Sequence, residues 1–155
     1  MRAAHTPPFE TSRMVGDTCL CLHIQRAGRA IARQFDTALR QLGLRSSQFS
    51  LLMMLNRPTP LSVGGLARCL AMDRTTTTAN LKPLERRGLL TVRRDARDTR
   101  AKQVALTGKG RTLLVRAVRR WQAANDAVRA SINGADLPTL YANLERIAGR
   151  SSEAC

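Results

Sequence analysis

Apolar residues recur every three or four positions through most of the chain, a period that predicts α-helices with one buried face. The longest such stretch starts at Thr18, and its apolar positions are Leu20, Ile24, Ala27, Ile31, Phe35, Leu39 and Leu42. Gly43 follows directly and is expected to end this helix. Residues 1–16 show no such period and contain Pro7 and Pro8, so they are predicted to form a flexible arm.

Shorter helical patterns follow along the chain. They cover residues 48–56, 62–70, 73–87, 107–128 and 136–147. Side chains that can accept a hydrogen bond at a helix N-terminus precede several of them: Ser46 or Ser47, Asp73 and Thr107. Pro83 lies inside the helix that starts at Asp73 and is expected to loosen the turn before it. Gly88 is expected to end that helix.

Two segments with alternating apolar and polar residues, 89–93 and 102–106, lie on either side of a charged stretch, which predicts a β-hairpin. The only acidic residues in this region are Asp95 and Asp98. They are outnumbered by five cations: Arg93, Arg94, Arg97, Arg100 and Lys102. So many cations repel one another unless a polyanion compensates them. A helix followed by a basic hairpin is typical of a winged helix-turn-helix. The predicted fold is therefore mainly α with a small β-hairpin (α+β).

The charge of the whole chain agrees with a polyanionic partner. Its 155 residues include 26 Lys and Arg against 11 Asp and Glu, a formal net charge of +15. Because this charge is spread over predicted elements, double-stranded DNA is the expected partner. No apolar run is long enough to span a bilayer and no signal peptide is visible, so we expect a cytoplasmic protein without a membrane partner. No nucleophile–base pair or phosphate loop is apparent, so neither an enzyme nor a cofactor is expected.

On the helix after Asp73, the face with Thr77, Leu81 and Leu84 is expected to be buried. The candidate DNA contacts on its other faces are Arg74, Thr75, Thr76, Thr78 and Lys82. Threonine hydroxyls and methyls suit base edges, whereas arginine suits guanine or phosphate. The alternative is that these threonines merely cap and solvate a surface helix.

The hairpin supplies a second set of candidate contacts. They are Arg93, Arg94, Arg97, Asp98 and Arg100. Arg97 is the candidate for a narrow minor groove, and Asp98 is expected to hold Arg100 through a bidentate pair. The alternatives are a solvated hairpin with incidental ion pairs, and a nucleoid-type protein that binds DNA without a preferred sequence.

The segment 21–109 resembles the MarR family of winged-helix transcription regulators. The residues that carry the resemblance are 73–76, 81–90, 95–100 and 106–110. The resemblance implies an obligate homodimer built from terminal helices, a palindromic promoter site and, usually, repression. It also implies release by a small ligand, often an aromatic acid, or by cysteine oxidation. Thr77 and Ala79 depart from the family pattern, which commonly has an apolar residue and a larger, often basic, residue there.

The predicted organisation has three parts. Residues 1–16 form the arm, 46–106 the DNA-binding winged helix-turn-helix, and 17–45 with 107–150 a helical dimerisation region. The terminal helices would leave apolar stripes exposed on a monomer, which usually marks a partner surface. A second copy would cover them and fit a palindromic site. The alternative is that both helices fold back onto their own centre.

Control by a small aromatic or carboxylate ligand is the expected route of regulation. The pocket is predicted between the dimerisation helices and the DNA-binding unit, with walls formed by Arg33, Phe35, Leu39, Phe49 and Met53. Redox control is the alternative, because Cys21 resembles the position at which some family members sense organic hydroperoxides. Those sensors have tyrosines near the thiol, and this chain has only Tyr141. The four cysteines predict neither a disulfide framework nor a metal site.

Overall fold

The computed structural model describes residues 6–94, 102–132, 134 and 136–149. The helices are α1 (Phe9–Thr18), α2 (Leu20–Leu39), the 3-10 turn η1 (Arg40–Leu42), α3 (Ser46–Met54), α4 (Val63–Cys69), α5 (Arg74–Arg86), α6 (Gly108–Ser131) and α7 (Leu137–Ile147). The strands are β1 (Leu61–Ser62), β2 (Leu90–Arg94) and β3 (Lys102–Leu106). No helix in these described ranges is both long and apolar enough to cross a membrane.

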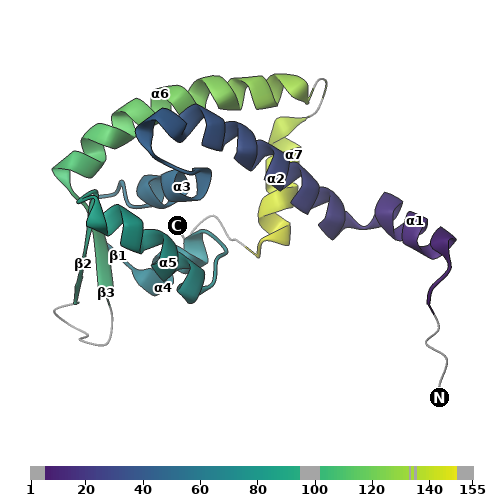
Figure 1. The fold of residues 1–155 in the computed structure, drawn as a ribbon, viewed down its shortest axis with the longest axis horizontal. Helices are drawn as coiled ribbons and strands as arrows, with labels where there is room; N and C mark the ends of the chain where they lie inside the picture. Colours follow the sequence, from purple (N-terminus) through teal and green to yellow (C-terminus); the bar gives the residue numbers. More distant parts are fainter. Residues whose placement is uncertain (1–5, 95–101, 133, 135, 150–155) are drawn as a thin grey trace, which may run out of the picture.

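The long helices α2 and α6 run side by side along one edge of the molecule, with α3 beneath them (Figure 1). Below α3 lie α4, α5 and the small sheet, and α1 projects from the far end of α2. One apolar core joins these layers, with fully buried side chains from α2, α3, α4, α5, β3 and α6: Leu39, Leu52, Leu66, Leu84, Val104 and Ala117. The predicted winged-helix fold, mainly α with a small sheet, is confirmed.

The sheet is antiparallel with strand order β1-β3-β2. Leu90 pairs with Leu106 and Arg94 with Lys102, so the predicted hairpin is confirmed to within one residue. Strand β1 was not predicted, because two residues are too short for an alternating pattern. It pairs with β3 through Leu61 and Val104 and makes β3 the central strand.

Most predicted helix ends are confirmed. The Ser62 hydroxyl accepts a hydrogen bond from Gly65 N–H at 2.9 Å, and the Thr107 hydroxyl accepts one from Gly110 N–H at 3.0 Å. Gly43 takes the left-handed conformation at the end of η1, with a φ of +63°. At these positions the local sequence alone determines where a helix starts or stops.

The predicted cap of α3 is wrong. Neither Ser46 nor Ser47 is its N-cap, because both belong to the helix and Arg45 precedes it. Arg45 N–H donates to the Gln48 side chain at 3.1 Å, and Ser46 N–H donates to Asp36 Oδ1 at 2.6 Å. The second partner comes from α2, ten residues earlier, so local sequence rules could not have found it.

The prediction of an arm up to residue 16 is wrong for residues 9–16, which lie in α1. Glu10 in its first turn complements the helix dipole, yet no α1 residue is buried. The chain is extended at Cys19, with a ψ of 104°, and α2 starts after it. The first long helix therefore begins two residues later than expected.

The first turn of α6 packs very closely against the chain that follows α5. Gly110 is buried, and a Cβ atom built on it would lie 2.0 Å from the main-chain oxygen of Leu89. Thr107 N–H donates to the same oxygen at 3.1 Å, and the Thr107 hydroxyl donates to the Gly88 oxygen at 2.7 Å. This approach fixes the start of α6 against the chain between α5 and β2.

Gly110→Ala is expected to destabilise the protein by about 1–3 kcal/mol, because the added methyl group must displace main-chain atoms. Gly108→Ala is the matched control, since a Cβ there meets nothing within 4 Å. It should change the free energy of unfolding by less than about 1 kcal/mol. Urea denaturation followed by circular dichroism measures both, and equal midpoints would contradict the close contact.

Candidate nucleic-acid interface

The start of α5 is held by Asp73. Its carboxylate accepts hydrogen bonds from Thr76 N–H at 2.7 Å and from the Thr76 hydroxyl at 2.6 Å. The hydroxyl bond, helped by the N–H bond, lowers the pKa of the Asp73 carboxyl below its ordinary value. The folded state therefore gains stability from Asp73 above the ordinary carboxyl range, and loses it as the pH falls through the lowered pKa. At neutral pH the Asp73 carboxylate is therefore charged and accepts both hydrogen bonds.

The four threonine hydroxyls of α5 are not equivalent. The Thr76 hydroxyl donates to Asp73 Oδ2, and the Thr77 hydroxyl donates to the Asp73 carbonyl at 2.8 Å and is fully buried. The Thr78 hydroxyl donates to a main-chain carbonyl one turn earlier, also at 2.8 Å. Thr75 is exposed, and no hydrogen bond joins its hydroxyl to the described part of the chain. Thr75 therefore has a hydroxyl free to donate, a distinction that the sequence did not reveal.

A groove of about 310 Å³ runs between α5 and the sheet. Cations from both sides line it, namely Arg74 and Lys82 from α5 and Lys102 from β3. Glu85 also lines it, and its Oε1 accepts a hydrogen bond from Val92 N–H at 3.3 Å. This bond connects α5 to edge strand β2 and helps to fix the hairpin relative to the helix.

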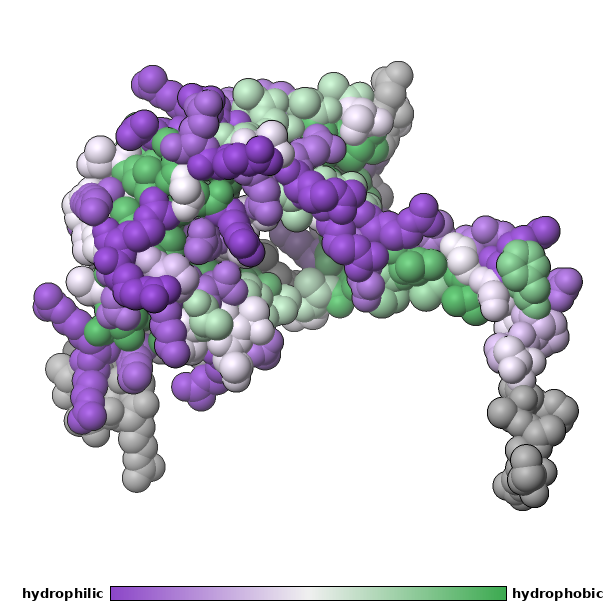
Figure 2. Space-filling view, viewed as in Figure 1, coloured by the Kyte–Doolittle hydropathy of each residue, from purple (hydrophilic) through white to green (hydrophobic). Residues whose placement is uncertain are grey.

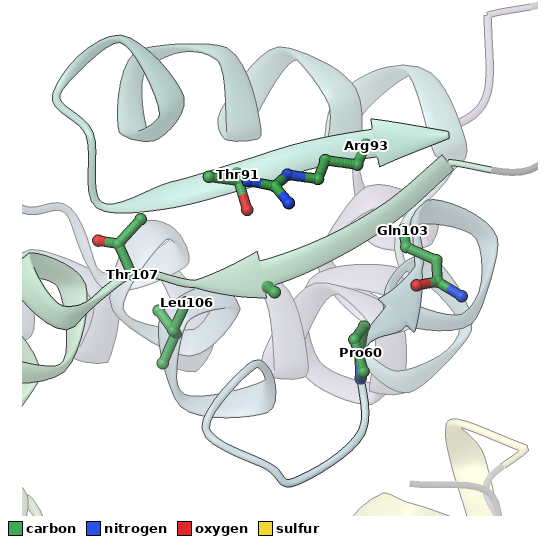
Figure 3. A pocket seen from close by; sticks show the side chains of 7 residues that line it. Pro60, Thr91, Arg93, Gln103, Leu106 and Thr107 are labelled. Carbon is green, nitrogen blue, oxygen red and sulfur yellow. The ribbon is translucent and has the colours of Figure 1, made fainter. Parts of the chain in front are cut away.

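The structure places Arg93 and Arg94 on opposite faces of the sheet. Arg94 pairs with Lys102 and shares its face with Val92, which lines the α5 groove. Arg93 lies on the outer face, where its side chain extends toward Thr91 (Figure 3). Lys102 is a site residue that the sequence analysis missed. Its pairing with Arg94, which brings it to the groove face, becomes visible only in the strand register.

The predicted contacts Arg97, Asp98 and Arg100 lie outside the described residues and stay predictions. Among the described residues, hydrophilic side chains gather over α5 and the base of the hairpin, at the lower left of Figure 2. Of the predicted site residues, Arg74, Thr78 and Lys82 line the groove between α5 and the sheet and Arg94 lies on the sheet face toward it, whereas Arg93 lies on the other face.

The predicted effector walls come from α2 and α3, and they lie in different surroundings. Leu39 is fully buried, and Phe49 is buried with its ring stacked on Trp121 at a centroid distance of 5.9 Å. Phe35 and Met53 are half-buried, and Met53 packs against this core. Arg33 is exposed and lines a separate groove with Ala124 of α6. The pocket therefore stays a prediction.

Cys21 is the second residue of α2, and its exposed Sγ accepts a hydrogen bond from the Gln25 amide at 3.2 Å. Cys19 is also a free thiol. Cys69 of α4 is buried and disulfide-bonded, a bond that the sequence analysis did not predict.

Comparison with known proteins identifies the family. A family model described as MarR family matches residues 42–101. The organic hydroperoxide resistance transcriptional regulator of Bacillus subtilis is 30% identical over 99 residues, which cover 64% of this chain and 67% of that protein. The chain belongs to the MarR family. It is a MarR-type transcriptional regulator.

Solved structures of other regulators support the same family. The M. tuberculosis regulator MosR in complex with DNA is 34% identical, with a TM-score of 0.75, and the match covers 84% of this chain and 94% of MosR. CouR from Rhodococcus jostii RHA1, bound to p-coumaroyl-CoA, is 25% identical, with a TM-score of 0.75 and coverage of 87% and 95%. This MarR-family chain therefore shares nearly the whole fold of both.

Arg94→Ala is expected to weaken binding to duplex DNA and to reduce the salt slope of log affinity by about one, as for the loss of one phosphate contact. Arg93→Ala removes the same charge from the outer face of the sheet and should have a clearly smaller effect. Fluorescence anisotropy at several salt concentrations measures both slopes. Equal losses in the two variants would show that net charge, and not the groove, determines binding.

Proposed function

We propose that this chain is a sequence-specific DNA-binding regulator that acts as a homodimeric repressor on a palindromic promoter site and is released by a small ligand. The observation that carries the DNA-binding part is the exposed start of α5. There the exposed Thr75, with its free hydroxyl, directly follows Arg74, which lines a groove together with Lys82 of the helix and Lys102 of the sheet.

In the proposed complex, the start of α5 enters the major groove and Thr75 contacts a base edge. The cations of the groove, together with Arg94, hold the neighbouring phosphates, which sets register without reading sequence. MosR, a neighbour of the same fold, is known in complex with DNA. Its likeness supports the same use of the fold here.

Thr75→Val should change which sequence is preferred, because it replaces a free hydroxyl by a methyl group of similar size. The expected cost is about 1–3 kcal/mol at particular base pairs. Thr112→Val on α6 is the control, since the exposed Thr112 hydroxyl also donates to a main-chain carbonyl one turn earlier and lies outside the groove beside α5. Selection from a random duplex pool, followed by competition against random duplex, measures both.

Equal loss of affinity for every sequence in Thr75→Val would make Thr75 a phosphate contact. A wild-type protein that does not prefer the selected duplex to random duplex would favour the nucleoid-type alternative instead.

The dimer is proposed from the apolar surface of the terminal helices. Neither α1 nor α7 has a buried residue. Large apolar side chains on them are exposed, with Phe9 at 75% and Ile147 at 58%. Figure 2 shows hydrophobic side chains along the projecting segment formed by α1 and the start of α2. A second copy that covers these stripes would also supply the second half of a palindrome reader.

Leu144→Asp is expected to shift the protein from dimer to monomer, because it places a charge within the apolar stripe of α7. Asn143→Asp adds the same charge about 100° around the helix and should leave the dimer intact. Sedimentation velocity distinguishes the two. A dimer that persists equally in both variants would exclude α7 from the interface.

Release by a small ligand, aromatic or carboxylate, is supported by CouR, whose structure holds p-coumaroyl-CoA. The B. subtilis relative is a regulator of organic hydroperoxide resistance, and Cys21 is exposed at the start of α2. Control by oxidation of Cys21 is therefore the second candidate. Release from DNA by organic hydroperoxide that disappears in Cys21→Ser would favour it over ligand control.

A further inference from the structure

Three helix ends meet at Arg87, the residue directly after α5. Its guanidinium donates through Nη2 to the Leu42 carbonyl at 2.9 Å and through Nη1 to the Gly43 carbonyl. These carbonyls end η1, which continues α2. The carbonyl of Arg87 itself accepts a hydrogen bond from Lys109 Nζ at 2.8 Å, in the first turn of α6. Arg87 thus connects the ends of α2–η1 and α5 with the start of α6.

The shape of the two C-terminal ends suits this connection. Gly43 and Gly88 follow η1 and α5 with φ values of +63° and +68°, which closes each end. A Cβ atom at Gly43 would lie 3.4 Å from Arg87 Nη2, so the guanidinium packs directly on this glycine. Helix C-termini carry partial negative charge, which a guanidinium compensates while its fork matches two carbonyls.

The connection matters because α3 lies between α2 and α5 (Figure 1). Apolar side chains of α3 fill this space, but hydrophobic contact is not directional. Hydrogen bonds depend strongly on angle. The paired bonds of Arg87 therefore restrict the direction of α5 relative to α2 in a way that the core alone does not.

We propose that Arg87 is a positioning residue that sets the direction of α5 relative to α2, and with it the half-site spacing that the dimer accepts. This inference rests on the proposed palindrome-binding dimer. Arg74 lies thirteen residues before Arg87, about 20 Å along the helix. A tilt of about 10° at Arg87 therefore moves the reading end by about 3 Å, close to the rise of one base pair of about 3.4 Å.

The test compares Arg87→Gln and Arg87→Lys with Arg86→Gln. Arg86 is exposed, and no hydrogen bond joins its side chain to the described residues, so this control removes the same charge without breaking the connection. The probes are the palindromic duplex that the wild type selects from a random pool, two duplexes with the half-sites one base pair closer or farther apart, and a single half-site. All are titrated with protein that sedimentation has shown to be dimeric.

In the wild type and in Arg86→Gln, the selected spacing should be clearly preferred. In Arg87→Gln the preference should fall at least fivefold, while affinity for the single half-site changes less than twofold. Arg87→Lys should lie between them, because an ammonium group is a point donor and not a fork. Equal loss on all duplexes would make Arg87 a stability residue only and would overturn the proposal.

Amide hydrogen exchange without DNA separates this inference from the proposed function. Exchange in residues 42–45 and in α5 should be faster in Arg87→Gln than in Arg86→Gln. Unchanged exchange would overturn the positioning role. A wild type that prefers no spacing contradicts the proposed function and the spacing role with it, while exchange still decides whether Arg87 holds α5 in place.

Discussion

The close approach of α6 to the end of α5 is the constraint on which the rest of the structure depends. Gly110 lets the first turn of α6 lie against the Leu89 carbonyl, and Thr107 uses its N–H and hydroxyl to hold the same turn. Because α6 also runs along α2, this contact joins the DNA-binding unit to the long helices. A bulkier residue at 110 would separate the two parts and change the position of both helix and hairpin.

The second constraint is electrostatic. Within the described residues, the groove beside α5 brings three cations together, and its one acid, Glu85, is engaged with β2. The Asp73 carboxylate is likewise engaged, since Thr76 donates to it twice. The nearby acids therefore order the local structure while the cations stay exposed to solvent. Such a surface suits a phosphate backbone, and its contribution to affinity should weaken as salt rises.

The sequence predicted the fold well, because apolar spacing and cap residues are local signals. Asp73, Thr107, Gly43 and Gly88 lie at the predicted ends for this reason. The missed features depend on residues distant in sequence, such as the hydrogen bond that Ser46 N–H, at the start of α3, donates to Asp36, and the pairing that brings Lys102 beside α5. For the site, the sequence predicted which residues belong to it but not how their roles differ. The difference between Arg93 and Arg94 required the strand register, and the difference between Thr75 and its neighbours required hydrogen-bond partners.

The internal bonds of α5 limit how much sequence this helix can read. The hydroxyls of Thr76 and Thr78 donate within the helix, so they offer DNA an acceptor and a methyl group but no hydrogen. Thr75 is left as a hydroxyl donor, beside the long cation of Arg74. Each base pair read in this way contributes only about 1–3 kcal/mol of discrimination. A regulator with so few direct contacts gains selectivity when two of its units must match one duplex together, because each half-site then counts only at the correct separation. Because of this requirement, a rigid connection between α5 and the long helices contributes directly to recognition. Arg87 lies at the end of α5 opposite the residues that read DNA, so a small change of angle at Arg87 produces the largest displacement of those residues.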